Sequence, residues 1–167
     1  RVSFSRPKQQ YVILGVTGPD EYENNVDNNW YTNYSCVQCL KTTLEYIDTI
    51  AGKYPDDYSR IRRATAFQYN EEAQRWTDII ERMYLPEDKE NAIFIQNDGY
   101  MDKELQSVGA IPTEERPINQ HWSWDRILRS CYIKQSDVLL GLYLYYFNFD
   151  KETVRRNFDF YEPMTVH

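Results

Sequence analysis

The sequence predicts a mostly helical protein whose helices pack in two layers. Apolar residues recur at steps of three and four residues in at least four segments, which is typical of helices with one buried face. One further segment, residues 134–147, is apolar almost all round, so we expect other helices to cover it on most sides. A chain of 167 residues can bury a sizeable core, and we expect one domain over residues 1–167.

The first elements expected are a short strand and a long helix. Residues 11–14 form an apolar run that is typical of a strand. The helix follows, with Asp27 or Asn28 as its N-terminal cap, and extends to about Ala51, where Gly52 is a natural stop. One apolar face defines this helix: Trp30, Tyr34, Val37, Leu40, Leu44 and Ile47.

Two more helices and an extended run follow in the middle of the chain. A short helix is expected after Pro55, and a longer one is expected over residues 71–83. Asn70 is the expected cap of the longer helix, and Pro86 is its stop. Residues 92–100 then form a short extended run that ends in a turn.

The last third begins with an irregular connection over residues 103–120. A connection of this length within a compact domain is usually functional or disordered. A short helix is expected over residues 122–130, followed by the apolar helix over residues 134–147. Asp150 caps a last helix that ends near Phe160.

The composition excludes several classes of protein. A net charge of −7 argues against a nucleic-acid partner, because phosphates attract basic surfaces. No apolar run approaches the length of a membrane span, and the first residues lack the apolar core of a signal peptide. The chain lacks an initial Met and stops in mid-pattern, so we expect it to be an internal piece of a longer protein.

The cysteines point to a reducing compartment. Their number, three, is odd, which does not suit a disulfide framework and favours a cytoplasmic protein. Cys36 and Cys39 are spaced as a metal-binding pair, but they fall within a helical pattern and lack a second pair. We therefore expect no metal site.

The densest group of chemically useful side chains is the acidic loop of residues 15–29. Gly15, Gly18 and Pro19 favour a stiff turn, and Asp20, Glu21 and Glu23 follow with several asparagines. This loop connects the expected strand to the head of the first long helix, and catalytic groups are often found on loops of rigid scaffolds. An acidic turn favoured by the helix dipole explains the same residues without any catalytic role.

Three motifs carry a family resemblance. Residues 15–29, GVTGPDEYENNVDNN, resemble the general-acid loop of the family 65 glycoside phosphorylases. Residues 116–126, RPINQHWSWDR, and residues 132–139, YIKQSDVL, resemble the same enzymes in the same order. Within the family the loop is most similar to the enzymes that act on maltose, because Glu23 follows Tyr22 where other members usually have His. The resemblance covers nearly the whole chain.

The resemblance implies a fold and a reaction. The fold is an (α/α)6 barrel, all-α apart from minor short strands near the acidic loop, of which this chain supplies roughly the C-terminal half. The reaction is the inverting phosphorolysis of maltose to β-glucose 1-phosphate and glucose, with phosphate as co-substrate and no other cofactor. Glu21 would be the general acid, with Glu23 as the alternative, and Lys134 and Gln135 would bind the glucosyl unit. The full-length protein would be a homodimer, and its phosphate-binding loop would follow the end of this chain.

The residues themselves suit this chemistry but leave alternatives. Cleavage of a glycosidic bond needs an acid to protonate the leaving oxygen, and an inverting hydrolase needs a second carboxylate that a phosphorylase does not. One acidic loop without a clear partner acid fits a phosphorylase. The alternatives are a trehalose or kojibiose phosphorylase, a hydrolase of the same fold, and a non-catalytic helical carbohydrate-binding fragment. Weaker candidates for sugar contacts are Asn24, His121 and Trp122.

Overall fold

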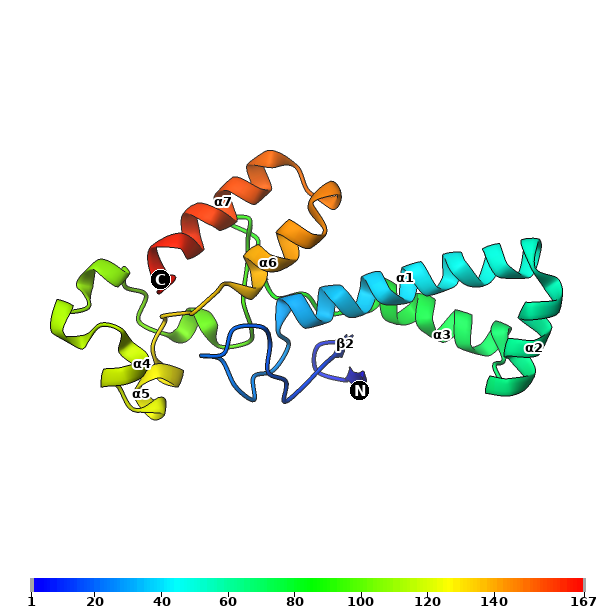
Figure 1. Cartoon of the computed structure of the whole chain (residues 1–167), viewed down its shortest axis with the longest axis horizontal. Coiled ribbons are helices and arrows are strands. Elements are labelled where there is room, and N and C mark those ends of the chain that lie inside the picture. Colours follow the sequence, from blue (N-terminus) through cyan, green and yellow to red (C-terminus); the bar gives the residue numbers. More distant parts are fainter. Residues whose placement is uncertain (1, 167) are drawn as a thin grey trace.

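A small antiparallel hairpin precedes the helices. The computed structural model describes residues 2–166. Strand β1 (Ser3–Ser5) pairs with β2 (Gln10–Val12), with Ser3 opposite Val12. The strand predicted over residues 11–14 therefore ends earlier, and Leu14 is 56% exposed because the chain already turns into the acidic loop. This hairpin lies beside that loop, near the middle of the molecule (Figure 1).

Three helices form a long arm on one side of the molecule. Helix α1 (Trp30–Lys53) and α3 (Tyr69–Arg82) pack against each other, and α2 (Pro55–Thr65) crosses their far ends (Figure 1). The predicted cap of α1 is wrong by one or two residues: Asn29 is the cap, and its side chain accepts a hydrogen bond from the Thr32 amide. The prediction that Gly52 ends this helix is also wrong, since α1 continues to Lys53.

The start of α3 also differs from the prediction. The helix begins at Tyr69, and its cap is Gln68 rather than Asn70. The Gln68 side chain makes no capping hydrogen bond, but the Glu72 carboxylate accepts one from the Gln68 backbone amide at 3.0 Å. An acid in the first turn therefore satisfies the free amide instead of a cap side chain.

The middle of the chain is built from single turns. Strands β3 (Glu87–Asp88) and β4 (Ile93–Phe94) form a second hairpin. Three 3-10 turns follow, η1 (Tyr100–Asp102), η2 (Val108–Ala110) and η3 (Thr113–Glu115), as expected for an irregular connection. The short helix predicted over residues 122–130 is present as α5 (Trp124–Arg129), which Ser123 caps. A further short helix, α4 (Ile118–His121), lies just before it, at the end of the connection predicted to be irregular.

The predicted apolar helix is shorter and less covered than expected. Helix α6 (Asp137–Leu144) starts after its cap Ser136, and the separate turn η4 (Tyr146–Asn148) follows it. Val138 and Leu142 are buried against neighbouring helices, whereas Tyr143 is 76% exposed. Among residues 2–166, only the face of α6 towards α1 and α7 is covered, so the expectation of burial on most sides is not met there.

The last helix agrees with the prediction. Helix α7 (Lys151–Tyr161) is capped by Asp150, whose carboxylate accepts a hydrogen bond from the Thr153 amide at 2.8 Å. The short turn η5 (Glu162–Met164) follows and contains Pro163. No helix within residues 2–166 is long and apolar enough to cross a membrane.

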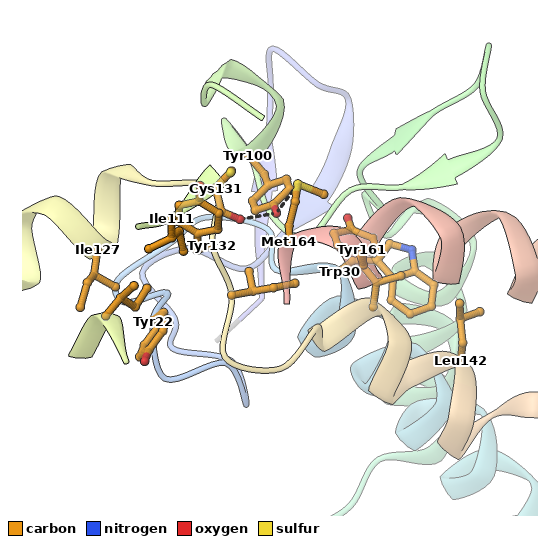
Figure 2. Close-up of a cluster of buried hydrophobic side chains, with 13 residues drawn as sticks. Tyr22, Trp30, Tyr100, Ile111, Ile127, Cys131, Tyr132, Leu142, Tyr161 and Met164 are labelled. Carbon is orange, nitrogen blue, oxygen red and sulfur yellow. Dashed lines mark hydrogen bonds between the residues drawn. The ribbon is translucent and has the colours of Figure 1, made fainter. Parts of the chain in front are cut away.

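The buried apolar side chains form two clusters, a small one of Ile13, Val37, Ile79 and Met83 that includes residues of α1 and α3, and a larger aromatic one. Trp30 at the head of α1 stacks between Tyr34 and Phe94, with ring centroids 4.8 and 4.7 Å away. Helix α6 approaches so closely that a Cβ at Gly141 would lie 2.6 Å from the Trp30 ring. On the other side of the cluster, the buried Tyr100 hydroxyl donates to the Cys131 carbonyl at 2.8 Å (Figure 2). The mostly helical fold is therefore confirmed, and its larger cluster lies directly under the acidic loop.

Candidate functional site

The acidic loop is closed at its base by backbone hydrogen bonds. The amides of Val16 and Val26 each donate to the other's carbonyl at 2.9 Å. Below this bridge, the Asn28 amide donates to the Ile13 carbonyl, and the Asn28 side chain accepts from the Ile13 amide. The two ends of residues 17–25 are therefore held together by hydrogen bonds, and the loop projects from this fixed base.

Asp20 is the inner anchor of this loop. Its side chain is fully buried, and its carboxylate accepts hydrogen bonds from the Lys134 amide at 2.9 Å, the Gln96 side chain at 3.0 Å and the Tyr22 amide at 3.2 Å. Burial raises the pKa of Asp20, and the backbone donors oppose that rise. A carboxylate with these partners holds the loop in place and has no access to a substrate.

Glu21 points the other way, into solvent. Its side chain is 64% exposed, and its carboxylate lies 2.5 Å from the Lys134 ammonium. This hydrogen bond raises the pKa of Lys134. The Gln135 side chain donates to the Pro19 carbonyl at 2.7 Å. The structure thus brings Glu21, Lys134 and Gln135 together, although they are far apart in sequence.

Lys134 and Gln135 do not begin the buried helix, as their position in the sequence suggested. Both are exposed and lie in the segment before α6, which starts at Asp137. The Ser136 hydroxyl caps that helix, accepting from the Leu139 amide at 3.3 Å. Because the helix begins later, both side chains are free to lie along the acidic loop.

Glu23 lies beneath the loop, in contrast to Glu21. It is 3% exposed, and its carboxylate pairs with the Lys103 ammonium at 2.5 Å. Burial raises the pKa of Glu23, and the Lys103 charge opposes that rise. A substrate in solvent meets Glu21 and not Glu23, so the geometry favours Glu21 as the acid.

The weaker sugar-contact candidates have other partners or lie apart. Asn24 is exposed and accepts from the Thr17 hydroxyl at 2.8 Å, a contact internal to the loop. His121 is exposed at the end of α4. The indole N–H of Trp122 donates to Glu115 at 2.5 Å, and the Arg126 guanidinium lies 3.6 Å from its ring centroid. Trp122 also packs against Tyr132, with ring centroids 5.7 Å apart, so the guanidinium covers one side of its ring and Tyr132 lies beside it.

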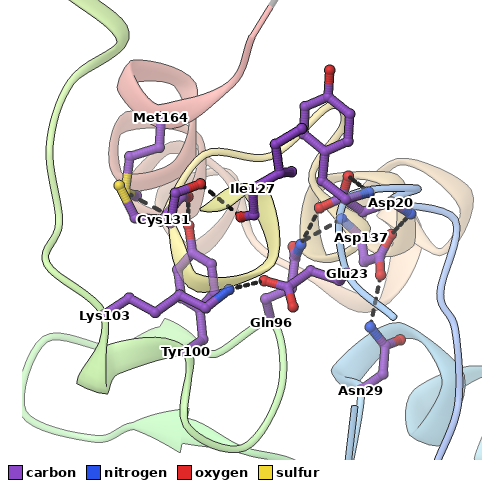
Figure 3. Close-up of polar contacts among 12 residues, drawn as sticks. Asp20, Glu23, Asn29, Gln96, Tyr100, Lys103, Ile127, Cys131, Asp137 and Met164 are labelled. Carbon is purple, nitrogen blue, oxygen red and sulfur yellow. Dashed lines mark hydrogen bonds and ion pairs between the residues drawn. The ribbon is translucent and has the colours of Figure 1, made fainter. Parts of the chain in front are cut away.

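Sequence reasoning missed the buried polar residues that support the loop. Asn29, Gln96 and Asp137 are all fully buried and hydrogen-bonded to one another or to Asp20 (Figure 3). Asp137 belongs to one of the three motifs but has the appearance of an ordinary acid at the start of a helix. Gln96 gives the clearest signal, because it is an amide directly after the apolar run of residues 92–95.

Neither a metal-ligand cluster nor the cysteine pair points to a metal site in the part of the chain that the structure describes. Within residues 2–166 there is no group of three or more His, Cys, Asp or Glu side chains that could hold a metal ion. Cys36 and Cys39 lie on α1 as free cysteines. An apolar groove of about 310 Å³ lies between α1, α2 and α3 on the arm; Trp76 lines it and Glu21 does not.

Comparison with known proteins finds relatives of this chain among disaccharide phosphorylases. The chain is 48% identical over its whole length to the maltose phosphorylase of Bacillus subtilis, and covers 21% of that protein. It is 39% identical over 95% of its length to the α,α-trehalose phosphorylase of Thermoanaerobacter brockii, and covers 20% of it. A solved structure from the human microbiome, provisionally assigned as a kojibiose phosphorylase, superposes with a TM-score of 0.85 at 34% identity, over all of this chain and 22% of that one.

The likeness extends over the whole chain but not over the whole of its relatives. The chain spans about a fifth of the length of the curated relatives it matches. The helical arrangement and the structural match are consistent with part of an (α/α)6 barrel. Residues 1–167 match the glycosyl hydrolase family 65 central catalytic domain from end to end. The chain therefore belongs to glycosyl hydrolase family 65, as a segment of its central catalytic domain.

Proposed function

We propose that the protein containing this chain is an inverting disaccharide phosphorylase with maltose as its substrate. Glu21 gives its proton to the glycosidic oxygen, and the C1–O bond breaks to release glucose. A phosphate oxygen bonds to C1 from the opposite face, which gives β-glucose 1-phosphate. The observation that carries this proposal is the position of Glu21, the one acid among Asp20, Glu21 and Glu23 that faces solvent.

Lys134 and Gln135 complete the proposed site. Without a sugar, the Lys134 ammonium holds the Glu21 carboxylate in an ion pair, so Glu21 accepts a hydrogen bond and does not donate one. In our proposal a hydroxyl of the glucosyl unit takes the place of Glu21 as the partner of Lys134. Gln135 offers an amide beside it for a second hydroxyl. Binding of the sugar would thereby release Glu21 to act as the acid.

The arrangement supports phosphorolysis over hydrolysis. An inverting hydrolase needs a second carboxylate, ~6.5–9.5 Å from the acid, to activate water. Asp27, the fourth acid of the loop, is exposed, and its carboxylate accepts a hydrogen bond from the Gly15 amide at 2.9 Å at the base of the loop. The other acids nearby, Asp20, Glu23 and Asp137, are buried and occupied by hydrogen bonds or an ion pair. None of these three is open to a water beside an exposed sugar, whereas phosphate is an anion and attacks without a base.

Maltose is the substrate we favour among those named for the relatives. Identity to the maltose phosphorylase is 48%, compared with 39% for the trehalose enzyme and 33% for a kojibiose phosphorylase of Thermoanaerobacter brockii. We further propose that the protein works in the cytoplasm, as its three free cysteines suggest. A homodimer of the full-length protein remains part of the proposal.

The test is a product analysis with the complete protein. Maltose, trehalose and kojibiose are each incubated with and without phosphate, and the products are followed by proton NMR. We expect maltose to give β-glucose 1-phosphate and glucose in equal amounts, only when phosphate is present. Glucose released at the same rate without phosphate would identify a hydrolase, and binding of maltose without turnover would identify a non-catalytic module.

A further inference from the structure

Two segments far apart in the sequence are joined directly behind the proposed acid. Residues 18–21 run beside residues 134–137, and the contacts between them connect residues 113 to 117 positions apart. The Lys134 amide donates to Asp20, and the Asp20 amide donates to the Asp137 carboxylate at 2.6 Å. The backbone of the residue before Glu21 is therefore held by a side chain at the head of α6.

Asp137 is fully occupied in this arrangement. It is fully buried, with one carboxylate oxygen facing the Asp20 amide and the other facing the Asn29 side-chain amide, each at 2.6 Å. Gly18 lies flat against it: a Cβ at Gly18 would be 2.0 Å from the second oxygen. The loop can approach Asp137 this closely only because residue 18 has no side chain.

Asn29 cannot turn its amide group around. Its side-chain oxygen accepts from the amide and the hydroxyl of Thr32, each at 3.0 Å, and so caps α1. Its nitrogen is consequently directed at Asp137. Asp137 thus faces a fixed donor on each side, and both of its oxygens must accept hydrogen bonds.

Gln96 adds a third support that also has one orientation. Its side-chain nitrogen donates to Asp20 at 3.0 Å, and its side-chain oxygen accepts from the Asp137 amide at 3.0 Å. Its backbone carbonyl accepts from the Trp30 amide at 2.9 Å. Figure 3 shows the Gln96 side chain reaching both Asp20 and Asp137. Three elements, the acidic loop, α1 and α6, therefore meet at one buried polar group.

We infer that Asp137 is a positioning residue for Glu21, acting through the Asp20 amide, with Asn29 and Gln96 fixing its orientation. This inference rests on the proposed function, because it assumes that Glu21 is the acid. Asp137 is too deeply buried to meet a substrate. What it determines is where the Glu21 carboxylate stands relative to the leaving oxygen, and a small displacement of a reacting group is costly, up to about 10²-fold in rate.

A reversal of polarity tests this inference in the complete protein. Asp137→Asn preserves shape but puts an NH₂ group against either the Asp20 amide or the Asn29 amide, so one hydrogen bond is lost. Adding Asn29→Asp restores the match: the amide introduced at position 137 donates to the carboxylate introduced at position 29, whose other oxygen still accepts from Thr32. The double variant contains the same carboxylate and amide with their places exchanged.

Two substrates separate a displaced acid from a general loss of structure. Maltose needs a proton on its leaving oxygen, whereas in α-glucosyl fluoride the C1–F bond breaks to release fluoride, which needs little protonation, as phosphate bonds to C1. We expect Asp137→Asn to lower kcat on maltose by about 10²-fold and on the fluoride by less than about fivefold. The double variant should return kcat on maltose to within about threefold of the wild type.

The outcomes are distinct from a failure of the proposed function. Equal losses on both substrates, or a folded double variant that stays slow on maltose, would overturn the positioning role. If Asp137→Asn does not fold, the double variant alone decides: wild-type kcat supports the inference, and a slow or unfolded double variant refutes it. Glu21→Gln is measured alongside. If it shows no selective loss on maltose, then the proposed function itself fails, whatever Asp137 does.

Discussion

Replacing Lys103 by methionine would leave the Glu23 carboxylate buried without its cation. The Glu23 side chain is 4% exposed and that of Lys103 is 15% exposed, with 2.5 Å between the charged atoms. Removing one partner of a buried pair costs about 3–5 kcal/mol. Because Lys103 reaches partly into solvent and methionine keeps most of its stem, we expect the lower end, about 3 kcal/mol in the free energy of unfolding.

This loss should depend on pH in a defined direction. Burial raises the pKa of Glu23 above its value in the unfolded chain, and the Lys103 charge opposes this rise. A carboxyl group with a raised pKa in the folded state contributes stability below its unfolded pKa, about 4.3, and loses it as the pH rises. The loss of unfolding free energy in Lys103→Met should therefore be largest near pH 8 and should shrink as the pH falls towards about 4.3.

Denaturant unfolding of the complete protein measures the effect. The four proteins of the cycle are the wild type, Lys103→Met, Glu23→Gln and the double variant, each at pH 8 and pH 5. The double variant has no buried charge at this place, so it should be more stable than Lys103→Met alone at pH 8. If the two single losses simply add, or if the Lys103→Met loss is the same at both pH values, the reasoning about this pair is wrong.

Three further predictions concern Gly18, Asp137 and Trp122. Gly18→Ala should lower both kcat and Tm, because the added Cβ would lie 2.0 Å from the Asp137 carboxylate. Gly52→Ala is the control: its Cβ would have no atom within 4 Å, so kcat should not change and the free energy of unfolding should rise by up to about 1 kcal/mol. Burial raises the pKa of Asp137 to about 7, so stability should fall as the pH rises between about 4 and 7, and thermal scans should show less of this fall in Asp137→Asn. Trp122→Leu should lower Tm, because the contacts of the indole with Arg126 and Glu115 are lost. The KM for maltose should stay within about twofold of the wild type, and a rise of about tenfold or more would identify Trp122 as a sugar contact.

Helix caps show which parts of the fold the sequence could predict. Asp150 was correctly predicted because its capping partner, Thr153, is three residues away and the contact is local. The cap of α1 was misplaced because Asn28 and Asn29 look alike in sequence. The Asn28 side chain accepts a hydrogen bond from the amide of Ile13, 15 residues away, so Asn29 caps the helix instead. Local signals therefore predict the helix, and they predict its first residue only where no distant contact competes for the capping side chain.

The candidate site shows the same division. Asp20, Glu21 and Glu23 are close together in sequence, and no local pattern separates the exposed Glu21 from the buried Asp20 and Glu23. The two buried carboxylates have distant partners: Lys103, 80 residues away, donates to Glu23, and Gln96, 76 residues away, donates to Asp20. Pairings of this range depend on the packed fold, so the sequence could indicate the loop and its chemistry but not the network that holds it.

The most direct test of the account compares Glu21→Gln with Glu23→Gln in the phosphorolysis of maltose by the complete protein. Glutamine keeps the size of either side chain and removes the transferable proton. We expect Glu21→Gln to lower kcat by about 10²–10⁴-fold, the usual contribution of general acid catalysis, and Glu23→Gln to affect kcat far less. A near-normal rate for Glu21→Gln together with loss of activity in Glu23→Gln would contradict the account and place the acid two residues later.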